Sequence, residues 1–156
     1  MIIEKGKIPN IISLNIPEIS KLITGFKTSG KIAKTDSNLL YLRIDDEYIH
    51  RAFPLLHNIN NNIQKPDYFR NPNEGAHISV IYPEENIIID DHDLHQEHQF
   101  VIKDIATAEL NSKIYYLYLV ESPSLLKLRN RYHLPNLLSF RGYLIGFHIT
   151  FGFELP

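Results

Sequence analysis

The chain of 156 residues contains no cysteine. Disulfides, thiolate zinc ligands and a thiol nucleophile are therefore excluded, and any metal site has to be built from histidine and carboxylate side chains. There is also little net charge, which is −2 with the histidines counted as neutral, and the pI is near 6.4. Because binding of a long nucleic-acid duplex usually depends on several Lys or Arg contacts with phosphates, this composition argues against such a partner.

Long apolar runs are missing as well. No stretch approaches the roughly 20 consecutive apolar residues of a membrane helix, and the N-terminal segment is interrupted by Gly6 and Pro9 and lacks a small-residue cleavage site. We therefore expect a soluble, cytoplasmic monomer with no membrane partner. The length fits a single domain over residues 1–156, in which residues 1–38 form an N-terminal extension of unassigned role.

Two short apolar segments each carry one histidine and one hydroxyl. Near the end of the chain, residues 146–153 read Gly-Phe-His-Ile-Thr-Phe-Gly-Phe, and about seventy residues earlier His77-Ile78-Ser79 repeats the order histidine, apolar residue, hydroxyl. Side chains alternate between the two faces of a strand. His148 and Thr150 are therefore expected to share one face, as are His77 and Ser79, while the opposite faces join the core.

The pattern around these segments predicts two similar halves. In the first, a strand over residues 39–45 precedes a helix that begins at Asp45 or Asp46, is broken at Pro54, and leads to the His77 strand. In the second, a strand over residues 113–121, which follows a predicted hairpin turn at Asn111-Ser112, precedes a helix capped by Ser122 and then the His148 strand. We expect two lobes related by a pseudo-twofold axis, with the two histidine faces meeting in one cleft.

Two further segments attract attention through their charges. Four lysines and no acid lie between Lys21 and Lys34, which predicts a mobile basic loop, either a solvated surface segment or one that contacts substrate phosphate. Residues 90–98 contain three histidines and four acids, with His92 and His95 three positions apart. We interpret residues 90–98 as a solvated polar loop, with a metal site as the alternative.

Two imidazoles that face each other across a cleft suit in-line displacement at phosphorus. One histidine takes a proton from the attacking hydroxyl or water, and the other gives a proton to the leaving oxygen. The hydroxyls of Ser79 and Thr150 can donate hydrogen bonds to the non-bridging phosphate oxygens. A nucleophilic serine triad is disfavoured because neither hydroxyl lies in a Gly-x-Ser-x-Gly turn.

The two motifs, His77-Ile78-Ser79-Val80 and His148-Ile149-Thr150-Phe151, resemble those of the 2H phosphoesterase superfamily. This superfamily includes the LigT-like enzymes and an RNA-repair-associated "Swiss army knife" branch, and the segment 116–129 is similar to the strand and helix found there. The resemblance covers roughly residues 39–153. The departures from the family pattern are Ser79 in place of the commoner threonine and the acidic pair Glu84-Glu85, which bears on the substrate.

The resemblance implies a bilobal α+β fold in which two antiparallel sheets, with helices around them, form a central cleft. It also implies hydrolysis of 2′,3′-cyclic phosphates, 2′-5′ linkages or related nucleotide esters without metal or other cofactor. His77 and His148 become the general acid/base pair, and Ser79 and Thr150 the phosphate ligands. The expected partner is a small nucleotide or an RNA end, and the alternative is a catalytically inactive nucleotide- or RNA-binding module of the same fold.

Several other residues are candidates for substrate binding. Arg141 lies in the predicted loop before the second motif, where a guanidinium can bind a phosphate. Aromatic rings commonly stack on unpaired bases. The candidates of this second kind, together with one further arginine, are Tyr41, Arg43, Tyr82 and Tyr143.

Overall fold

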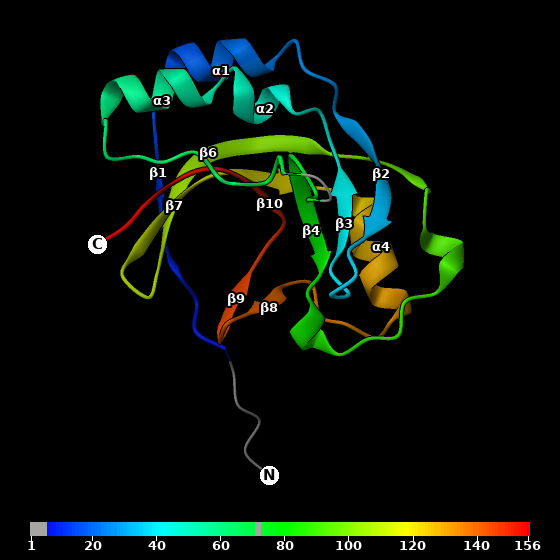
Figure 1. The fold of residues 1–156 in the computed structure, drawn as a ribbon. Coiled ribbons are helices and arrows are strands. Elements are labelled where there is room, and N and C mark those ends of the chain that lie inside the picture. Colours follow the sequence, from blue (N-terminus) through cyan, green and yellow to red (C-terminus); the bar gives the residue numbers. More distant parts are fainter. Residues whose placement is uncertain (1–5, 71–72) are drawn as a thin grey trace.

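The computed structural model describes residues 6–70 and 73–156. Two four-stranded antiparallel sheets form its frame (Figure 1). The first has the strand order β4 (His77–Ile81), β3 (Leu40–Arg43), β2 (Ser29–Lys34) and β5 (Glu97–Gln99). The second has the order β1 (Asn10–Ser13), β6 (Val101–Leu110), β7 (Lys113–Glu121) and β10 (His148–Glu154). A separate hairpin pairs β8 (Leu138–Phe140) with β9 (Tyr143–Ile145).

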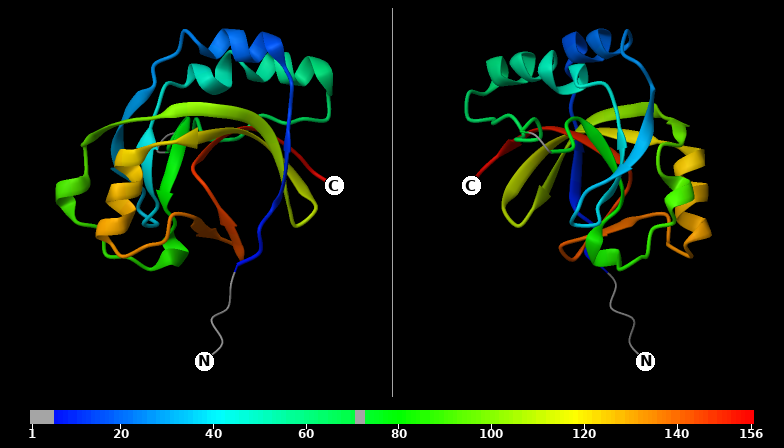
Figure 2. Two further views of the ribbon diagram at one scale, coloured as in Figure 1. Left: turned by 180° about the vertical axis from the view of Figure 1, so that it is seen from behind. Right: turned by 45° about the vertical axis from the view of Figure 1, so that its right-hand side comes forward.

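The helices lie outside the sheets and confirm the predicted α+β class. Three of them, α1 (Pro17–Ile23), α2 (Glu47–His50) and α3 (Phe53–Ile59), lie together on one side of the molecule, and α4 (Pro123–Arg131) lies apart from them (Figures 1 and 2). The 3-10 turns are η1 (Pro83–Glu85) and η2 (Asp91–Asp93). The predicted break lies just before Pro54, between α2 and α3. Pro54 stands in the first turn of α3, because proline cannot supply the amide hydrogen that the interior of a continuous helix requires.

The two halves of the chain correspond strand by strand. Each histidine strand lies at a sheet edge and pairs with the strand that precedes its helix, β4 with β3 and β10 with β7. Read outward from the histidine strand, the orders are β4-β3-β2-β5 and β10-β7-β6-β1. The outermost strands are exchanged, because β1 from the start of the chain joins the second sheet and β5 joins the first.

The helices are exchanged in the same way. Helices α2 and α3, from the first half, pack on β10, whereas α4, from the second half, packs on β4 and β5. Tyr118 connects α2 to β10 within the second sheet's packing layer. Its hydroxyl donates a hydrogen bond of 2.8 Å to the Tyr48 carbonyl oxygen on α2, and its ring stacks on Phe151 of β10 at 4.3 Å. Burial of such a ring contributes about 2–3 kcal/mol and fixes the position of β10.

Helix α4 begins as the sequence predicts. Pro123 is in its first turn and the Ser122 hydroxyl accepts a hydrogen bond from the Leu125 amide. Its other end holds a fully buried ion pair. The Arg129 guanidinium donates to both carboxylate oxygens of Glu85, at 2.9 and 2.7 Å, and also to the Val80 carbonyl oxygen of β4. The guanidinium therefore ties α4 to the end of the first histidine strand.

The N-terminal part of the chain differs most from the prediction. The basic loop expected over residues 21–34 is wrong for its second half, because Ser29–Lys34 forms β2, hydrogen-bonded between β3 and β5. Only Ile32 of β2 is fully buried, so its sequence shows little of the alternation that marks a half-buried strand. With β1 and α1, this segment places residues 10–34 inside the architecture of both sheets.

Two other segments also gain structure. The short loop predicted before the His148 strand contains the β8–β9 hairpin, which turns at Arg141 and Gly142 with φ values of 48° and 84°. Residues 90–98, predicted as a loop, contain η2 and the start of β5. As for membranes, the helices of the described chain are all too short or too polar to cross one.

Candidate active site

The two histidine strands meet at a cavity of about 280 Å³. His77 and Ser79 reach it from β4, and His148 and Thr150 reach it from β10. The structure thus brings together the four residues that the two motifs predict. The remaining lining residues are Leu39, Tyr68, Glu74, Tyr82, Leu110, Tyr115, Leu117, Phe140, Arg141 and Ile145.

Both imidazoles are held by the same backbone contact. His77 Nδ1 lies 2.7 Å from the carbonyl oxygen of Gly75, and His148 Nδ1 lies 2.8 Å from that of Gly146. Since a carbonyl oxygen can only accept, each Nδ1 carries the hydrogen and donates it. Each Nε2 is therefore left for proton exchange with a bound substrate, and the repeated contact makes the two histidines equivalent in orientation.

A β-bulge follows the hydroxyl residue in each motif. Along β4 the pairing skips Val80, between the pairs Tyr41–Ser79 and Leu40–Ile81, and along β10 it skips Phe151 after Thr150. A bulge bends its strand and changes the direction of nearby side chains. In β4 the carbonyl oxygen of the bulged residue accepts from Arg129. The equivalent bulges are a second feature, besides the histidine contacts, that the two strands share.

Burial sets the charge of the two imidazoles. It lowers the pKa of His77, and the hydrogen bond to Gly75 and the negative charge of Glu74 only partly oppose this effect. Burial also lowers the pKa of His148, with a further contribution from the positive charge that His77 carries when protonated. Both histidines are therefore neutral at pH 7 in the free protein, and a positive charge on His77 would disfavour protonation of His148.

Glu74 distinguishes the first histidine from the second. Its Oε1 lies 3.9 Å from His77 Nε2, and its side chain is only 20% exposed. The preceding β-strand secures this turn, because the Arg43 guanidinium donates to the Glu74 carbonyl oxygen and, at 2.8 Å, to Asp46 Oδ2. The next residue, Gly75, has φ +64°, and an added Cβ there would collide with the Arg43 guanidinium.

Two tyrosine hydroxyls supplement those of the motifs. Tyr68 lies against His77 with its ring edge-on at 4.7 Å, and its phenol interacts with the Thr150 hydroxyl. The Tyr82 phenol interacts with the Ser79 hydroxyl. Burial raises the pKa of Tyr68, and it raises the pKa of Tyr82 to about 12. Both phenols therefore keep their protons at neutral pH and can donate hydrogen bonds to an anion.

The other predicted binding residues divide into two groups. Arg141 and Tyr82 line the cavity, whereas Tyr41, Arg43 and Tyr143 do not belong to its lining. Tyr41 contacts the His77 ring edge-on at 5.6 Å, and Arg43 holds the turn at Glu74. Tyr143 forms hydrogen bonds with Asn111. These three residues position the site instead of lining it.

The sequence interpretation missed Glu74, Tyr68 and the two glycine carbonyl groups. A signal for the glycines was present, because Gly75 and Gly146 both lie two residues before their histidine. The pair Glu84-Glu85, which seemed to bear on the substrate, has a structural role instead. Glu85 forms the ion pair with Arg129, and Glu84 Oε1 accepts a hydrogen bond of 2.7 Å from the Arg141 amide.

The histidine- and acid-rich segment 90–98 is engaged in other contacts. Asp93 is buried and accepts hydrogen bonds from Arg131 and Tyr132, and His98 Nδ1 lies 2.8 Å from the Ser124 hydroxyl. Among the described residues, no three histidine or acidic side chains are grouped so that they could hold a metal ion. The alternative of a metal site in this segment thus has no geometric support.

Comparison with known families agrees with this geometry. The family model described as "Swiss Army Knife, 2H phosphoesterase domain" matches residues 40–155. The chain belongs to this family. The match spans both histidine strands of the 2H phosphoesterase domain and leaves β1, α1 and β2 outside it. Of these elements, β2 belongs to the first sheet and β1 to the second. Searches of curated proteins and of solved structures found no match.

The paired histidines of this 2H phosphoesterase domain have the arrangement that acid/base chemistry at phosphorus needs. Two Nε2 atoms free of backbone contacts can serve as proton acceptor and proton donor on opposite sides of a phosphate. Hydroxyl donors beside them can stabilise the charge that develops on the non-bridging oxygens. The cavity's volume of about 280 Å³ lies just below the range of roughly 300–1,000 Å³ that is typical of small-molecule sites.

Proposed function

We propose that this 2H phosphoesterase domain hydrolyses a phosphodiester in which a ribose hydroxyl is the leaving group, such as a 2′,3′-cyclic phosphate or a 2′-5′ linkage. The observation that carries the proposal is the matched pair of imidazoles that line one cavity, each with Nδ1 bonded to a glycine carbonyl, which leaves Nε2 for proton exchange. Neither of the other two cavities described for the chain is lined by a histidine.

The reaction follows from the protonation of the two histidines. One neutral imidazole takes a proton from water as the water oxygen attacks phosphorus, and the other, in its protonated form, gives a proton to the departing ribose oxygen. The negatively charged phosphodiester itself favours the protonated form of a nearby imidazole. Ser79, Thr150 and the phenols of Tyr68 and Tyr82 donate to the non-bridging oxygens.

The experiment is hydrolysis of a substrate panel in the presence of EDTA. The panel contains 2′,3′-cyclic mononucleotides, 2′-5′ and 3′-5′ dinucleotides, cyclic dinucleotides and an RNA with a cyclic-phosphate end. We expect at least one member to be cleaved, and His77→Ala and His148→Ala each to lose about 10²–10⁴-fold in rate. His92→Ala, which alters an exposed histidine outside the cavity, is the control.

Three outcomes contradict the proposal. Activity that survives both substitutions removes the histidines from the chemistry. Activity that EDTA abolishes assigns the reaction to a metal. A folded wild-type protein that binds nucleotide at the cavity and cleaves no member of the panel is the non-catalytic binding module, the alternative function for this fold.

A further inference from the structure

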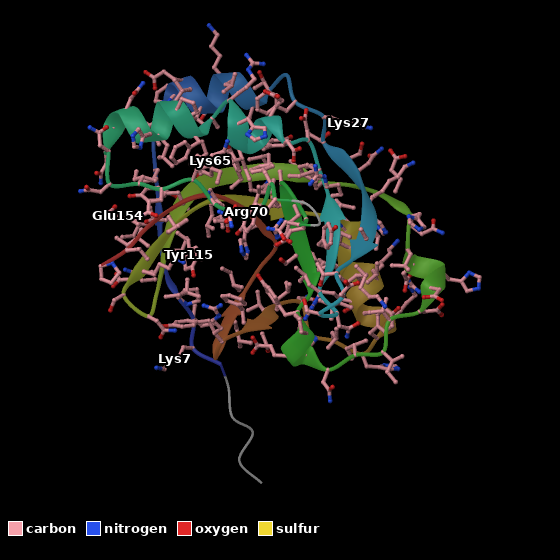
Figure 3. The ribbon with its side chains drawn as sticks, viewed as in Figure 1. Lys7, Lys27, Lys65, Arg70, Tyr115 and Glu154 are labelled. Carbon is pink, nitrogen blue, oxygen red and sulfur yellow. The ribbon has the colours of Figure 1, made fainter. Side chains whose placement is uncertain are left out.

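A second cavity adjoins the histidine cleft. Its volume is about 190 Å³, and four of its six lining residues, Leu110, Tyr115, Phe140 and Arg141, also line the cleft. The other two, Asn111 and Lys113, belong to the tip of the β6–β7 hairpin. Because they share these walls, the two cavities lie side by side between the histidine pair and this tip. Figure 3 shows Tyr115, one of the shared walls, on β7 beside the end of β10.

Two hairpin turns build this second cavity and are tied to each other. Tyr143, next to the β8–β9 turn, accepts a hydrogen bond of 3.1 Å from the Asn111 amide in the β6–β7 turn. Its hydroxyl also donates to Asn111 Oδ1 at 3.4 Å. On the other side, Glu84 accepts from the Arg141 amide at 2.7 Å. Both turns are therefore fixed relative to the cleft, and the cavity is preformed.

The cations of the second cavity lie on aromatic rings. Lys113 Nζ lies 5.0 Å from the ring centre of Tyr115 and 4.4 Å from that of Phe153. Arg141 Cζ lies 5.0 Å from the ring centre of Phe140, which in turn packs on Tyr82 at 4.7 Å. Within residues 6–70 and 73–156, neither cation forms an ion pair with a carboxylate. The nearby Glu84 uses one oxygen on the Arg141 backbone amide.

We infer that Lys113 and Arg141 bind a second phosphate of the substrate while the histidine pair acts on the first. This inference rests on the proposed function. Two cations without carboxylate partners, one of them a guanidinium, attract a phosphate group. The rings of Tyr115 and Phe140 lie between the two anion sites and can contact the ribose and base. The substrate class is a nucleotide that carries both a reacting phosphate at its 2′ or 3′ position and a 5′-phosphate.

Binding measurements test the site for the second phosphate without requiring turnover. Isothermal titration calorimetry of the whole protein compares adenosine 3′-monophosphate with adenosine 3′,5′-bisphosphate. We expect the bisphosphate to bind about 10-fold more tightly, since charge-assisted hydrogen bonds to the second phosphate are added. Lys113→Gln and Arg141→Gln should each reduce this ratio of dissociation constants, and the double variant should bring it close to 1.

Matched controls remove one positive charge elsewhere. Lys103→Gln alters a lysine near the start of β6 that pairs with Glu121 of β7. Arg51→Gln alters an arginine that pairs with Glu47. Both controls should keep the wild-type ratio. If wild type binds the two nucleotides equally, or if the double variant keeps the preference, the second phosphate site is wrong while the proposed function stands. If neither nucleotide binds, the second phosphate site is wrong, and the hydrolysis panel alone decides the proposed function.

A third probe separates the two sources of such a substrate. A dinucleotide with a 3′-phosphate places a phosphodiester where the bisphosphate has its 5′-phosphate. If the dinucleotide binds as tightly as the bisphosphate, the substrate is the end of a strand. Weaker binding identifies a free nucleotide. Either result upholds the second phosphate site, because the preference of the bisphosphate over the monophosphate decides that question.

Discussion

Glu74 Oε1 lies 3.9 Å from His77 Nε2, and no described carboxylate forms such a pair with His148. The two halves of the site are otherwise alike in their glycine contacts and bulges. A negative charge beside one imidazole favours the protonated form of that imidazole. Glu74 therefore breaks the symmetry. Under the proposed function we expect His77 to be the acid that protonates the leaving oxygen and His148 to be the base.

Glu74→Gln tests this assignment. We expect the pKa of His77 to fall further below its ordinary value, because the opposing charge is lost while burial and the nearby Arg43 remain. The other groups that face His77 are the neutral phenols of Tyr41 and Tyr68, and His148. A histidine NMR titration measures the pKa directly, and the alkaline limb of the pH–rate profile, where the general acid loses its proton, should move in the same direction. Glu97→Gln, at an exposed position on β5, is the control. An unchanged titration of His77 would remove Glu74 from this role.

Tyr68→Phe is expected to slow turnover by up to about 10²-fold with little change in KM. The substitution keeps the ring that packs on His77 and removes only the phenol beside Thr150, a donor for charge that develops in the transition state. Tyr41→Phe is the matched control, because Tyr41 also contacts His77 edge-on but lies outside the cavity lining. Equal effects of the two substitutions on kcat would mean that packing on His77, not hydrogen bonding, is what matters.

Glu85→Gln is expected to lower the free energy of unfolding by about 3–5 kcal/mol. The side chains of Glu85 and Arg129 are 3% and 0% exposed, so removal of the carboxylate leaves the guanidinium charge buried without its partner. Urea denaturation measures the change. Glu121→Gln breaks the exposed pair with Lys103 and should change stability by less than about 1 kcal/mol. A similar small effect at Glu85 would show that the carbonyl oxygens around Arg129 suffice to hold it.

Gly75→Ala and Gly142→Ala separate backbone strain from steric contact. Both glycines have positive φ, 64° and 84°, which costs an L-residue about 1–2 kcal/mol. A Cβ at Gly142 meets nothing within 4 Å, whereas one at Gly75 meets the Arg43 guanidinium. We expect Gly75→Ala to be the more destabilising in thermal unfolding and to reduce kcat, because Gly75 also supplies the acceptor for His77. If both variants lose the same stability, the Arg43 side chain moves away from the added Cβ without a loss of free energy.

Stability should fall as the pH is lowered from about 7 to 5. Above the ordinary histidine pKa of about 6.5, the folded and unfolded chains both hold neutral His77 and His148. Below it the unfolded chain binds protons more readily than the folded chain, since burial lowers the pKa values of both histidines in the folded chain. The free energy of unfolding therefore falls as the pH is lowered. The double variant His77→Gln/His148→Gln should show a weaker pH dependence of its melting temperature, and His92→Gln should match wild type. His98, whose pKa burial also lowers, contributes the remainder.

Local patterns predicted those parts of the fold that depend on local rules. The Asn111-Ser112 turn adopts positive φ at both residues, which is typical of a tight hairpin, and Ser122-Pro123 opens a helix as such a pair usually does. The His-x-Ser/Thr alternation placed each histidine on the same face of its strand as the neighbouring hydroxyl, because strand geometry has a period of two, and both of these faces reach the cavity.

What the sequence did not reveal depends on distant contacts. Strand β2 carries one buried residue and owes its conformation to hydrogen bonds with β3 and β5. The bulges at Val80 and Phe151 arise from pairing with neighbouring strands, so alternation alone cannot locate them. Glu74 comes from a turn that Arg43 secures through the backbone, and a charge pattern read along the chain does not show that contact.

The exchange of strands and helices between the halves means that neither half is an independent folding unit. A cut between η1 and β5 would leave an N-terminal fragment whose sheet lacks β5 and its covering helix α4, and a C-terminal fragment that lacks β1 and helices α1–α3. Each fragment would expose the apolar surface that the other is shaped to cover. The two pieces therefore have to fold by associating, and the cleft, which consists of one histidine strand from each, would form only as they join.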